Sequence, residues 1–349
     1  MTAEYYIQVV IAHTIGAVYG VLFVLSMVYR CIRHPFKFFN EETNKKKRDV
    51  MPTCLNDPTL GTHGFIHLEN VKLHYVSNGD EKKPLMLLIH GFPEFWYSWR
   101  FQLRAFAKDY RVVAIDQRGY SESEKPEGYK SYSLDKLVGD IKQLIPALGH
   151  RSAVVVGHDW GGAIAWSFAM KHQDMVEKLI VLNCPHPSTF RAHLRKSFDQ
   201  FKKSWYMFFF QMPYLPEYML TRDDFKSISI MFTGRSGGVK VGSLSDDDVE
   251  AYKYAFSQPG GLTGPLNFYR SSMKSPRNRS VPKIEVPTLM VWGCQDLALS
   301  REYPTMAKEY VTNLTIKYIA EASHWVQMDT PDIVNGLIKE FLEETNTDQ

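Results

Sequence analysis

The chain alternates short, continuous apolar runs with longer stretches in which apolar residues recur at helical spacing. The runs at 84–90, 110–116 and 176–182 suit fully buried strands of a parallel sheet. Between them, residues 98–108 and a segment that begins at Ser133 have the periodicity of amphipathic helices. This alternation predicts an α/β fold with a mostly parallel central sheet flanked by helices.

Further elements are predicted at both ends of this alternation. Residues 65–79 read as two short strands joined by a turn at Glu69 and Asn70. Towards the C-terminus the strand pattern resumes at 287–293 and 314–319, and a closing helix is expected from Pro331. The predicted buried face of that helix consists of Ile333, Val334, Leu337, Ile338 and Phe341.

The alternation of strands and helices is interrupted between 185 and 282, where the chain is rich in aromatic residues, Met, Pro and Gly. An insertion at this place predicts a mostly helical cap over the core, with an apolar binding pocket beneath it. The expected division is an N-terminal membrane anchor with its basic flank (1–37), a linker (38–64), the first part of the core (65–184), the cap (185–282) and the second part of the core (283–345).

The N-terminal segment 5–29 contains no Asp, Glu, Lys or Arg. As a helix it would extend about 37 Å, enough to cross a bilayer with some tilt. A cleaved signal peptide is the alternative, but Glu4 precedes the apolar segment and the basic residues Arg30 and Arg33 follow it. This order of charges favours a retained anchor.

The basic residues after the anchor also bear on its orientation. By the positive-inside rule, the basic residues Arg30, Arg33, Lys37 and the run 45–48 predict that the part of the chain after the anchor lies in the cytosol. We expect a single-pass membrane protein of the endoplasmic reticulum. The glycosylation patterns at Asn278 and Asn313 would matter only on the luminal side, so they leave the orientation open. The run 45–48 is expected either to rest on anionic lipid headgroups or to be a solvated linker.

The sequence Gly157-His-Asp-Trp-Gly-Gly162 follows a buried strand and precedes an apolar helix. This is the pattern of the strained turn that presents a nucleophile at a helix N-terminus in α/β hydrolases. The residue at its apex is Asp159, and a carboxylate forms an ester by displacement at an sp3 carbon, which suits epoxides and alkyl halides. The alternative is a Gly-rich turn in which Asp159 only caps the helix.

An acid and a histidine follow Asp159 in the order that this fold requires. Asp296 follows the strand at 287–293, and His324 follows the strand at 314–319, whereas Glu321 is too close to His324 to orient it easily. The loop after the strand at 84–90 places the Phe92 N–H as one donor of an oxyanion hole. The Trp160 N–H is expected to be the other.

Composition excludes several other classes of protein. The chain has 349 residues, of which 44% are hydrophobic, and a net charge of only +3, so nucleic acid binding is not expected. Cys31, Cys54, Cys184 and Cys294 have neither disulfide-scaffold nor metal-site spacing. No Gly-x-Ser-x-Gly motif is present, which excludes a serine esterase as far as sequence can.

With these motifs in hand, the chain resembles the epoxide hydrolases of the α/β-hydrolase fold, in particular the membrane-anchored animal enzymes of types three and four. The resemblance extends from Cys54 onward and is most specific at Gly264-Pro-Leu-Asn-Phe-Tyr-Arg270 and Glu321-Ala-Ser-His-Trp325. It implies that Tyr269 and Tyr206 donate hydrogen bonds to the epoxide oxygen. Tyr214 and Tyr218 are alternatives to Tyr206.

The resemblance implies a two-step reaction on lipophilic epoxides, such as epoxy fatty acids. Asp159 would open the ring to form an ester, and water activated by His324, which Asp296 orients, would release a vicinal diol. No metal or cofactor is expected in this chemistry, and no oligomeric state is predicted. The alternatives are a haloalkane dehalogenase on the same fold and a catalytically silent, membrane-tethered binding module.

Overall fold

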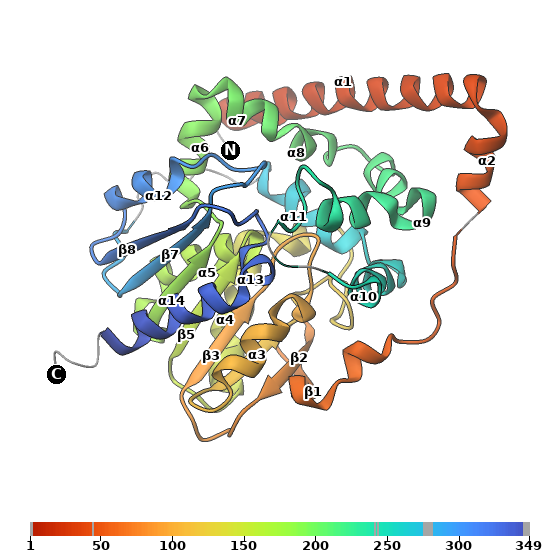
Figure 1. Ribbon diagram of the computed structural model, residues 1–349. Helices are drawn as coiled ribbons and strands as arrows, with labels where there is room; N and C mark the ends of the chain where they lie inside the picture. Colours follow the sequence, from red (N-terminus) through yellow and green to blue (C-terminus); the bar gives the residue numbers. More distant parts are fainter. Residues whose placement is uncertain (1–2, 44, 241, 243, 275–281, 345–349) are drawn as a thin grey trace.

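A computed structural model describes residues 3–43, 45–240, 242, 244–274 and 282–344. Its centre is an eight-stranded sheet with the order β1-β2-β4-β3-β5-β6-β7-β8 (Figure 1). The strands are β1 (Thr62–His67), β2 (Lys72–Asn78), β3 (Leu85–Ile89), β4 (Arg111–Ile115), β5 (Ala153–His158), β6 (Val176–Leu182), β7 (Thr288–Gly293) and β8 (Leu314–Ile319).

The pairing of the strands confirms the predicted sheet. From β4 to β8 all neighbours are parallel, and β1 and β2 add an antiparallel edge. Every residue of β3, β4 and β5 is buried, which explains why these strands are continuous apolar runs. Parallel strands place their carboxyl ends at one edge of the sheet, and the loops after β3, β5, β7 and β8 therefore converge there.

Helices cover both faces of the sheet (Figure 1). They include α3 (Arg100–Phe106), α4 (Leu134–Ala147), α5 (Trp160–Lys171) and α14 (Pro331–Glu344). On α14 the buried residues are Val334, Ile338, Phe341 and Leu342, whereas Ile333 is exposed. The prediction for Ile333 was wrong because the buried face of the helix is centred on Val334, Ile338 and Phe341 and includes Leu342 rather than Ile333.

Between β6 and β7 the described residues form a layer of helices over the carboxyl edge of the sheet (Figure 1). These are α6 (Pro187–Lys196), α7 (Phe198–Lys203), α8 (Trp205–Phe209), α9 (Leu215–Thr233), α10 (Asp246–Ser257) and α11 (Thr263–Ser272). In α9 the helical backbone is interrupted at residues 222–225. Asn278 lies outside the described residues.

The N-terminal helix α1 (Ala3–Arg33) lies along this layer of helices rather than apart from the body (Figure 1). Its rings pack on α8, with Tyr19 and Trp205 at 5.8 Å and Phe23 and Phe209 at 5.5 Å between ring centroids. Phe23 also contacts Tyr218 of α9. Gly16 lets the backbones approach, because a Cβ there would stand 2.4 Å from the Phe208 carbonyl oxygen. Residues 6–33 are long and apolar enough to cross a membrane.

A short helix α2 (Pro35–Thr43) and an extended segment connect α1 to the core. Within that segment Arg48 is buried, and its guanidinium forms ion pairs of 2.7 Å with both Asp224 and Glu250 of the cap layer. The expectation that the run 45–48 rests on lipid headgroups or is merely solvated is therefore wrong for Arg48. Its charge is already paired, so the linker is fastened to α9 and α10.

Candidate active site

The strand β5 ends in a sharp turn that carries Asp159 at its apex. The backbone of Asp159 has φ 49° and ψ −119°, in the left-handed half of conformational space that costs a non-glycine residue about 1–3 kcal/mol. Glycines make the turn possible: a Cβ on Gly161 would stand 1.9 Å from the Ile89 carbonyl oxygen, and one on Gly157 would stand 2.4 Å from the Gly161 carbonyl oxygen. The turn places Asp159 directly before the first residue of α5.

The Asp159 carboxylate lies within hydrogen-bonding distance of the predicted oxyanion hole. The Phe92 N–H donates a hydrogen bond to Asp159 Oδ1 (2.9 Å). Trp160 is the first residue of α5, so its N–H has no carbonyl partner within the helix and belongs to the positive end of the helix dipole. An anion at this position is stabilised from two sides.

His324 stands between two carboxylates. Its Nδ1 donates to Asp296 Oδ2 (2.6 Å), and its Nε2 lies 3.6 Å from Asp159 Oδ2. Asp296 also accepts hydrogen bonds from the Asn183 side chain (2.8 Å) and from the N–H groups of Ala298 and Leu299. These bonds fix the carboxylate, and the carboxylate in turn fixes the orientation of the His324 ring.

The electrostatics of this group follow from its geometry. Burial alone would raise the pKa of Asp159, but the hydrogen bond and charge of His324, the charge of His158 and the Phe92 N–H hold it below its usual value. Burial alone would lower the pKa of His324, but Asp296 and Asp159 raise it well above its usual value. The resting site therefore holds Asp159 as a carboxylate next to a histidine that readily carries a proton.

Two tyrosines face Asp159 from the cap. Tyr206 of α8 and Tyr269 of α11 line a cavity together with Asp159 and Trp160, and their ring centroids are 5.9 Å apart. Burial and the charge of Asp159 raise the pKa of both phenols, so both keep their protons and are available as donors. Of the alternatives to Tyr206, Tyr214 is 83% exposed and Tyr218 packs against Phe23 of α1.

The seven residues singled out from the sequence thus meet in one place, although their catalytic roles remain predictions. The rest of the cavity is mainly apolar. Its lining includes Leu134, Leu137, Pro187, Phe190, Met207, Phe268, Met273 and Leu299. Arg191 of α6 is a cationic residue of this lining.

A buried network beneath the site was missed by sequence reasoning. His158 Nδ1 bonds to Glu94 Oε2 (2.6 Å), and its Nε2 bonds to the His324 carbonyl oxygen (2.8 Å). Glu94 also accepts from the Gly91 N–H (2.8 Å) and from the Gln327 side chain (2.7 Å). The network joins the loop of Phe92, the residue before Asp159 and the loop of His324. Its sequence signal is weak, since Glu94 and His158 stand next to motif residues without a pattern of their own.

Comparisons with known proteins agree with this geometry. A family model described as alpha/beta hydrolase fold matches residues 84–331. Epoxide hydrolase 4 of Mus musculus is 48% identical over 332 residues, which cover 93% of this chain and 91% of that protein. Epoxide hydrolase 3 of Xenopus tropicalis is 42% identical over 302 residues, which cover 85% of this chain and 82% of that protein.

A solved structure is similar as well. A mutant of an epoxide hydrolase from Bacillus megaterium, complexed with a naphthyloxy-propane-1,2-diol product, has a TM-score of 0.73 and 37% identity. The match covers 80% of this chain and 99% of that one. The similarity therefore extends over nearly the whole length of that protein.

Proposed function

Because this chain belongs to the epoxide hydrolases of the α/β-hydrolase fold, we propose that it converts lipophilic epoxides to vicinal diols through an ester on Asp159. The observation that carries the proposal is that three kinds of group meet at Asp159, which lines the cavity. A carboxylate lies at the apex of the elbow, a His–Asp pair stands beside it, and two phenols face it from the cap.

In the first step Asp159 attacks one epoxide carbon from the side opposite the C–O bond. The new C–O bond forms as the ring C–O bond breaks, and the departing oxygen takes hydrogen bonds and then a proton from Tyr206 and Tyr269. The raised pKa of both phenols keeps them protonated until the alkoxide, which is a stronger base, develops. The product of this step is an ester between Asp159 and the alkyl chain.

In the second step water attacks the carbonyl carbon of that ester. Esterification removes the charge of Asp159, and with it one cause of the raised pKa of His324. His324 therefore becomes able to take the proton of the attacking water, while Asp296 stabilises the imidazolium that forms. The Phe92 and Trp160 N–H groups hold the tetrahedral oxyanion. Its collapse expels the diol oxygen, which takes the proton of the added hydroxyl, and restores the carboxylate. The proton on His324 then returns to the phenolate that the first step left.

To test this function, the full chain in detergent would be incubated with a lipophilic epoxide in one reaction and with a primary bromoalkane in another. Diol from the epoxide without bromide release supports the proposal. Bromide release without diol would instead indicate the dehalogenase alternative, which needs halide-binding N–H donors where this site presents phenols. Failure to convert several epoxides would favour the silent binding module.

The two tyrosines provide a graded prediction. We expect Tyr206→Phe and Tyr269→Phe each to slow ester formation by about 10- to 100-fold. This effect is smaller than the loss of activity when a site has a single hydrogen-bond donor, because the other phenol remains. The double variant should lose more than either. Stopped-flow or quench measurement of the first step checks this result, and Tyr214→Phe, exposed on the same cap, is the matched control. Equal rates for wild type and double variant would contradict the proposed role.

The two steps should also differ in their pH dependence. Ester hydrolysis needs His324 without its added proton. Ester formation needs ionised Asp159, whose pKa is lowered, and the protonated phenols of Tyr206 and Tyr269, whose pKa is raised. As the pH falls through the pKa of His324 in the ester, the second step should slow while the first continues. Quenched samples should then contain more esterified enzyme, until Asp159 itself protonates at lower pH. A constant ester fraction across this window would contradict the assignment.

Arg191 supports epoxy fatty acids as one substrate class. It lines the cavity and forms no ion pair within the described ranges, while partial burial and the nearby Arg195 lower its pKa. A fatty-acid carboxylate would supply the missing counter-charge. We expect Arg191→Gln to raise KM about tenfold for epoxy fatty acids, equivalent to one charge-assisted hydrogen bond, and to leave neutral epoxides unchanged. Arg195→Gln is the control, and equal effects on both substrate types would contradict the role.

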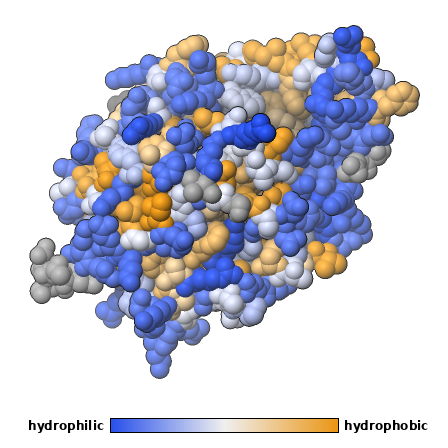
Figure 2. Space-filling model, viewed as in Figure 1, coloured by the Kyte–Doolittle hydropathy of each residue, from blue (hydrophilic) through white to orange (hydrophobic). Residues whose placement is uncertain are grey.

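The membrane association that we propose involves the cap as well as α1. The outer face of α1 is apolar and exposed, and it lies at the upper edge of the molecule (Figures 1 and 2). Phe198, Trp205 and Tyr214 expose further aromatic surface on the cap. We propose that α1 anchors the chain in the endoplasmic reticulum membrane with the catalytic part in the cytosol. Resistance to alkaline extraction tests the anchor, and glycan on the exposed Asn313 would contradict the orientation.

A further inference from the structure

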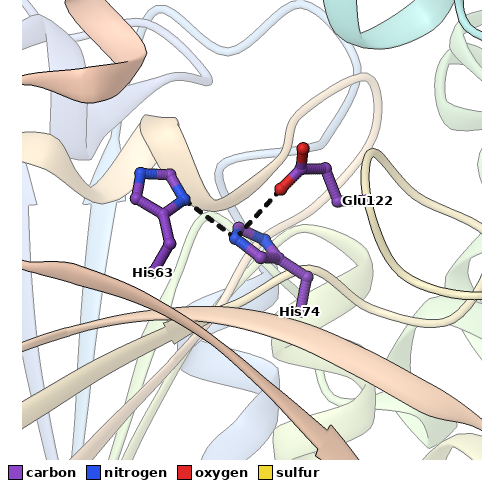
Figure 3. A group of neighbouring side chains, drawn as sticks. All are labelled: His63, His74 and Glu122. Carbon is purple, nitrogen blue, oxygen red and sulfur yellow. Dashed lines mark hydrogen bonds and ion pairs between the residues drawn. The ribbon is translucent and has the colours of Figure 1, made fainter.

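Three side chains with metal-binding atoms meet at the antiparallel edge of the sheet (Figure 3). His63 of β1 lies diagonally across from His74 of β2, because the register pairs His74 with Phe65. Its Nδ1 stands 2.9 Å from His74 Nε2, and Glu122 Oε2, from the loop after β4, stands 3.3 Å from the same His74 nitrogen. His74 is fully buried, His63 is half-buried and Glu122 is exposed.

The remaining nitrogen of each ring already has an acceptor. His74 Nδ1 lies 2.7 Å from the buried carboxylate of Asp116, and His63 Nε2 lies 2.9 Å from the Leu55 carbonyl oxygen. Both contacts require an N–H on the ring, since neither a carboxylate nor a carbonyl can donate. In the neutral rings the proton is thereby assigned, and His74 Nε2 and His63 Nδ1 are left as bare lone pairs.

Three electron-pair donors therefore converge without a hydrogen between them: two imidazole nitrogens and the Glu122 carboxylate. Such a group needs a cation at its centre. The carboxylate of Asp116 behind His74 is the outer-shell partner that orients metal-bound histidines in known sites. A shared proton between the two rings is the alternative cation.

We propose that His63, His74 and Glu122 bind a divalent transition-metal ion, with Zn²⁺ as the best match. Two imidazoles and one carboxylate are a ligand set that Zn²⁺ accepts, usually with water as a fourth ligand. With bonds of about 2.1 Å, the separations of 2.9 and 3.3 Å correspond to angles of roughly 90° and 105° at the metal. The exposed side at Glu122 leaves room for the water.

The position of the cluster indicates a structural role for the metal. It would fasten the β1–β2 edge to the loop after β4, where Ser123 Oγ already accepts from the His74 N–H and the Lys72 carbonyl accepts from the Glu124 N–H. None of its three ligands lines the cavity at Asp159. The metal therefore stabilises this edge without taking part in epoxide hydrolysis, and the inference does not rest on the proposed function.

The test uses the full chain in detergent, without a histidine tag, freed of metal by a chelator and then titrated with Zn²⁺ or Co²⁺. We expect about one Zn²⁺ per chain by calorimetry, visible d–d absorption of bound Co²⁺, and a higher Tm with metal. His63→Gln and Glu122→Gln should each bind at least about tenfold more weakly. His67→Gln, exposed on the same strand, is the matched control and should bind like wild type.

Glu122→Gln changes an exposed side chain, so it keeps the test valid if His63→Gln lowers the Tm of the metal-free chain. Equal Zn²⁺ affinity in wild type, His63→Gln and Glu122→Gln would overturn the proposal, because the ion would then be bound elsewhere. Absence of binding by the wild type would overturn it as well and would leave the shared proton as the cation of the cluster.

Discussion

Asp159→Asn should lower diol formation by at least about 10⁴-fold, the scale on which loss of a catalytic-unit residue acts in other hydrolases. An amide has no anionic oxygen with which to displace the epoxide oxygen, so the first step fails while the cavity keeps its shape. The amide side chain would also retain an oxygen that accepts from the Phe92 N–H, which is the contact present in the wild type. Product formation measured over long incubations checks the result.

The control for this variant is Asp174→Asn, a carboxylate exposed at the surface. Asp174→Asn should keep the wild-type Tm within a few degrees, since surface changes cost little. Asp159→Asn should remain folded, because the amide has the shape of the carboxylate and retains an acceptor for the Phe92 N–H. Residual activity of Asp159→Asn within tenfold of the wild type, after removal of contaminating enzyme, would contradict a nucleophilic role. It would then favour direct attack of water on the epoxide.

His324→Gln should separate the two steps. Without a base the second step should slow by about 10²- to 10⁴-fold. Ester formation should continue, because Asp159 still has the Phe92 N–H and the helix N-terminus beside it. The variant is therefore expected to stop after one turnover, with enzyme whose intact mass has increased by that of the substrate. Peptide mapping should place the addition on Asp159.

His67→Gln is the control here too, and it should show neither the mass increase nor the loss of turnover. If His324→Gln turned over normally, His324 would not be the base. If it neither turned over nor gained mass, His324 would be needed for the first step, and the separation of roles between His324 and the tyrosines would be wrong.

The fold was predictable from sequence because its elements carry local patterns. The buried parallel strands are continuous apolar runs, and the antiparallel pair β1–β2 shows alternation with a turn between its strands. The placement of the candidate site residues was predictable because strand ends carry them in a fixed chain order, as with Asp159, Asp296 and His324. Sequence reasoning placed them in one site, and the distances come from the structure.

The contacts that sequence reasoning missed depend on pairing between distant segments. The bond between Glu94 and His158 joins loops after two different strands, and no local periodicity records it. Likewise His63, His74 and Glu122 meet through the register of β1 and β2 and through a loop beyond β4, so their spacing resembles no metal motif. The packing of α1 on α8 depends on the place of Gly16 against a carbonyl, which an apolar pattern does not reveal.

The central claim, that the diol receives its new oxygen from Asp159 in the first turnover, is tested most directly by isotope labelling. The wild-type enzyme, in excess over a lipophilic epoxide, would complete a single turnover in H₂¹⁸O. The diol and the enzyme would then be analysed by mass spectrometry. We expect unlabelled diol and one ¹⁸O in the Asp159 carboxylate, because water attacks the ester carbonyl carbon. Labelled diol with unlabelled Asp159 would contradict the ester intermediate.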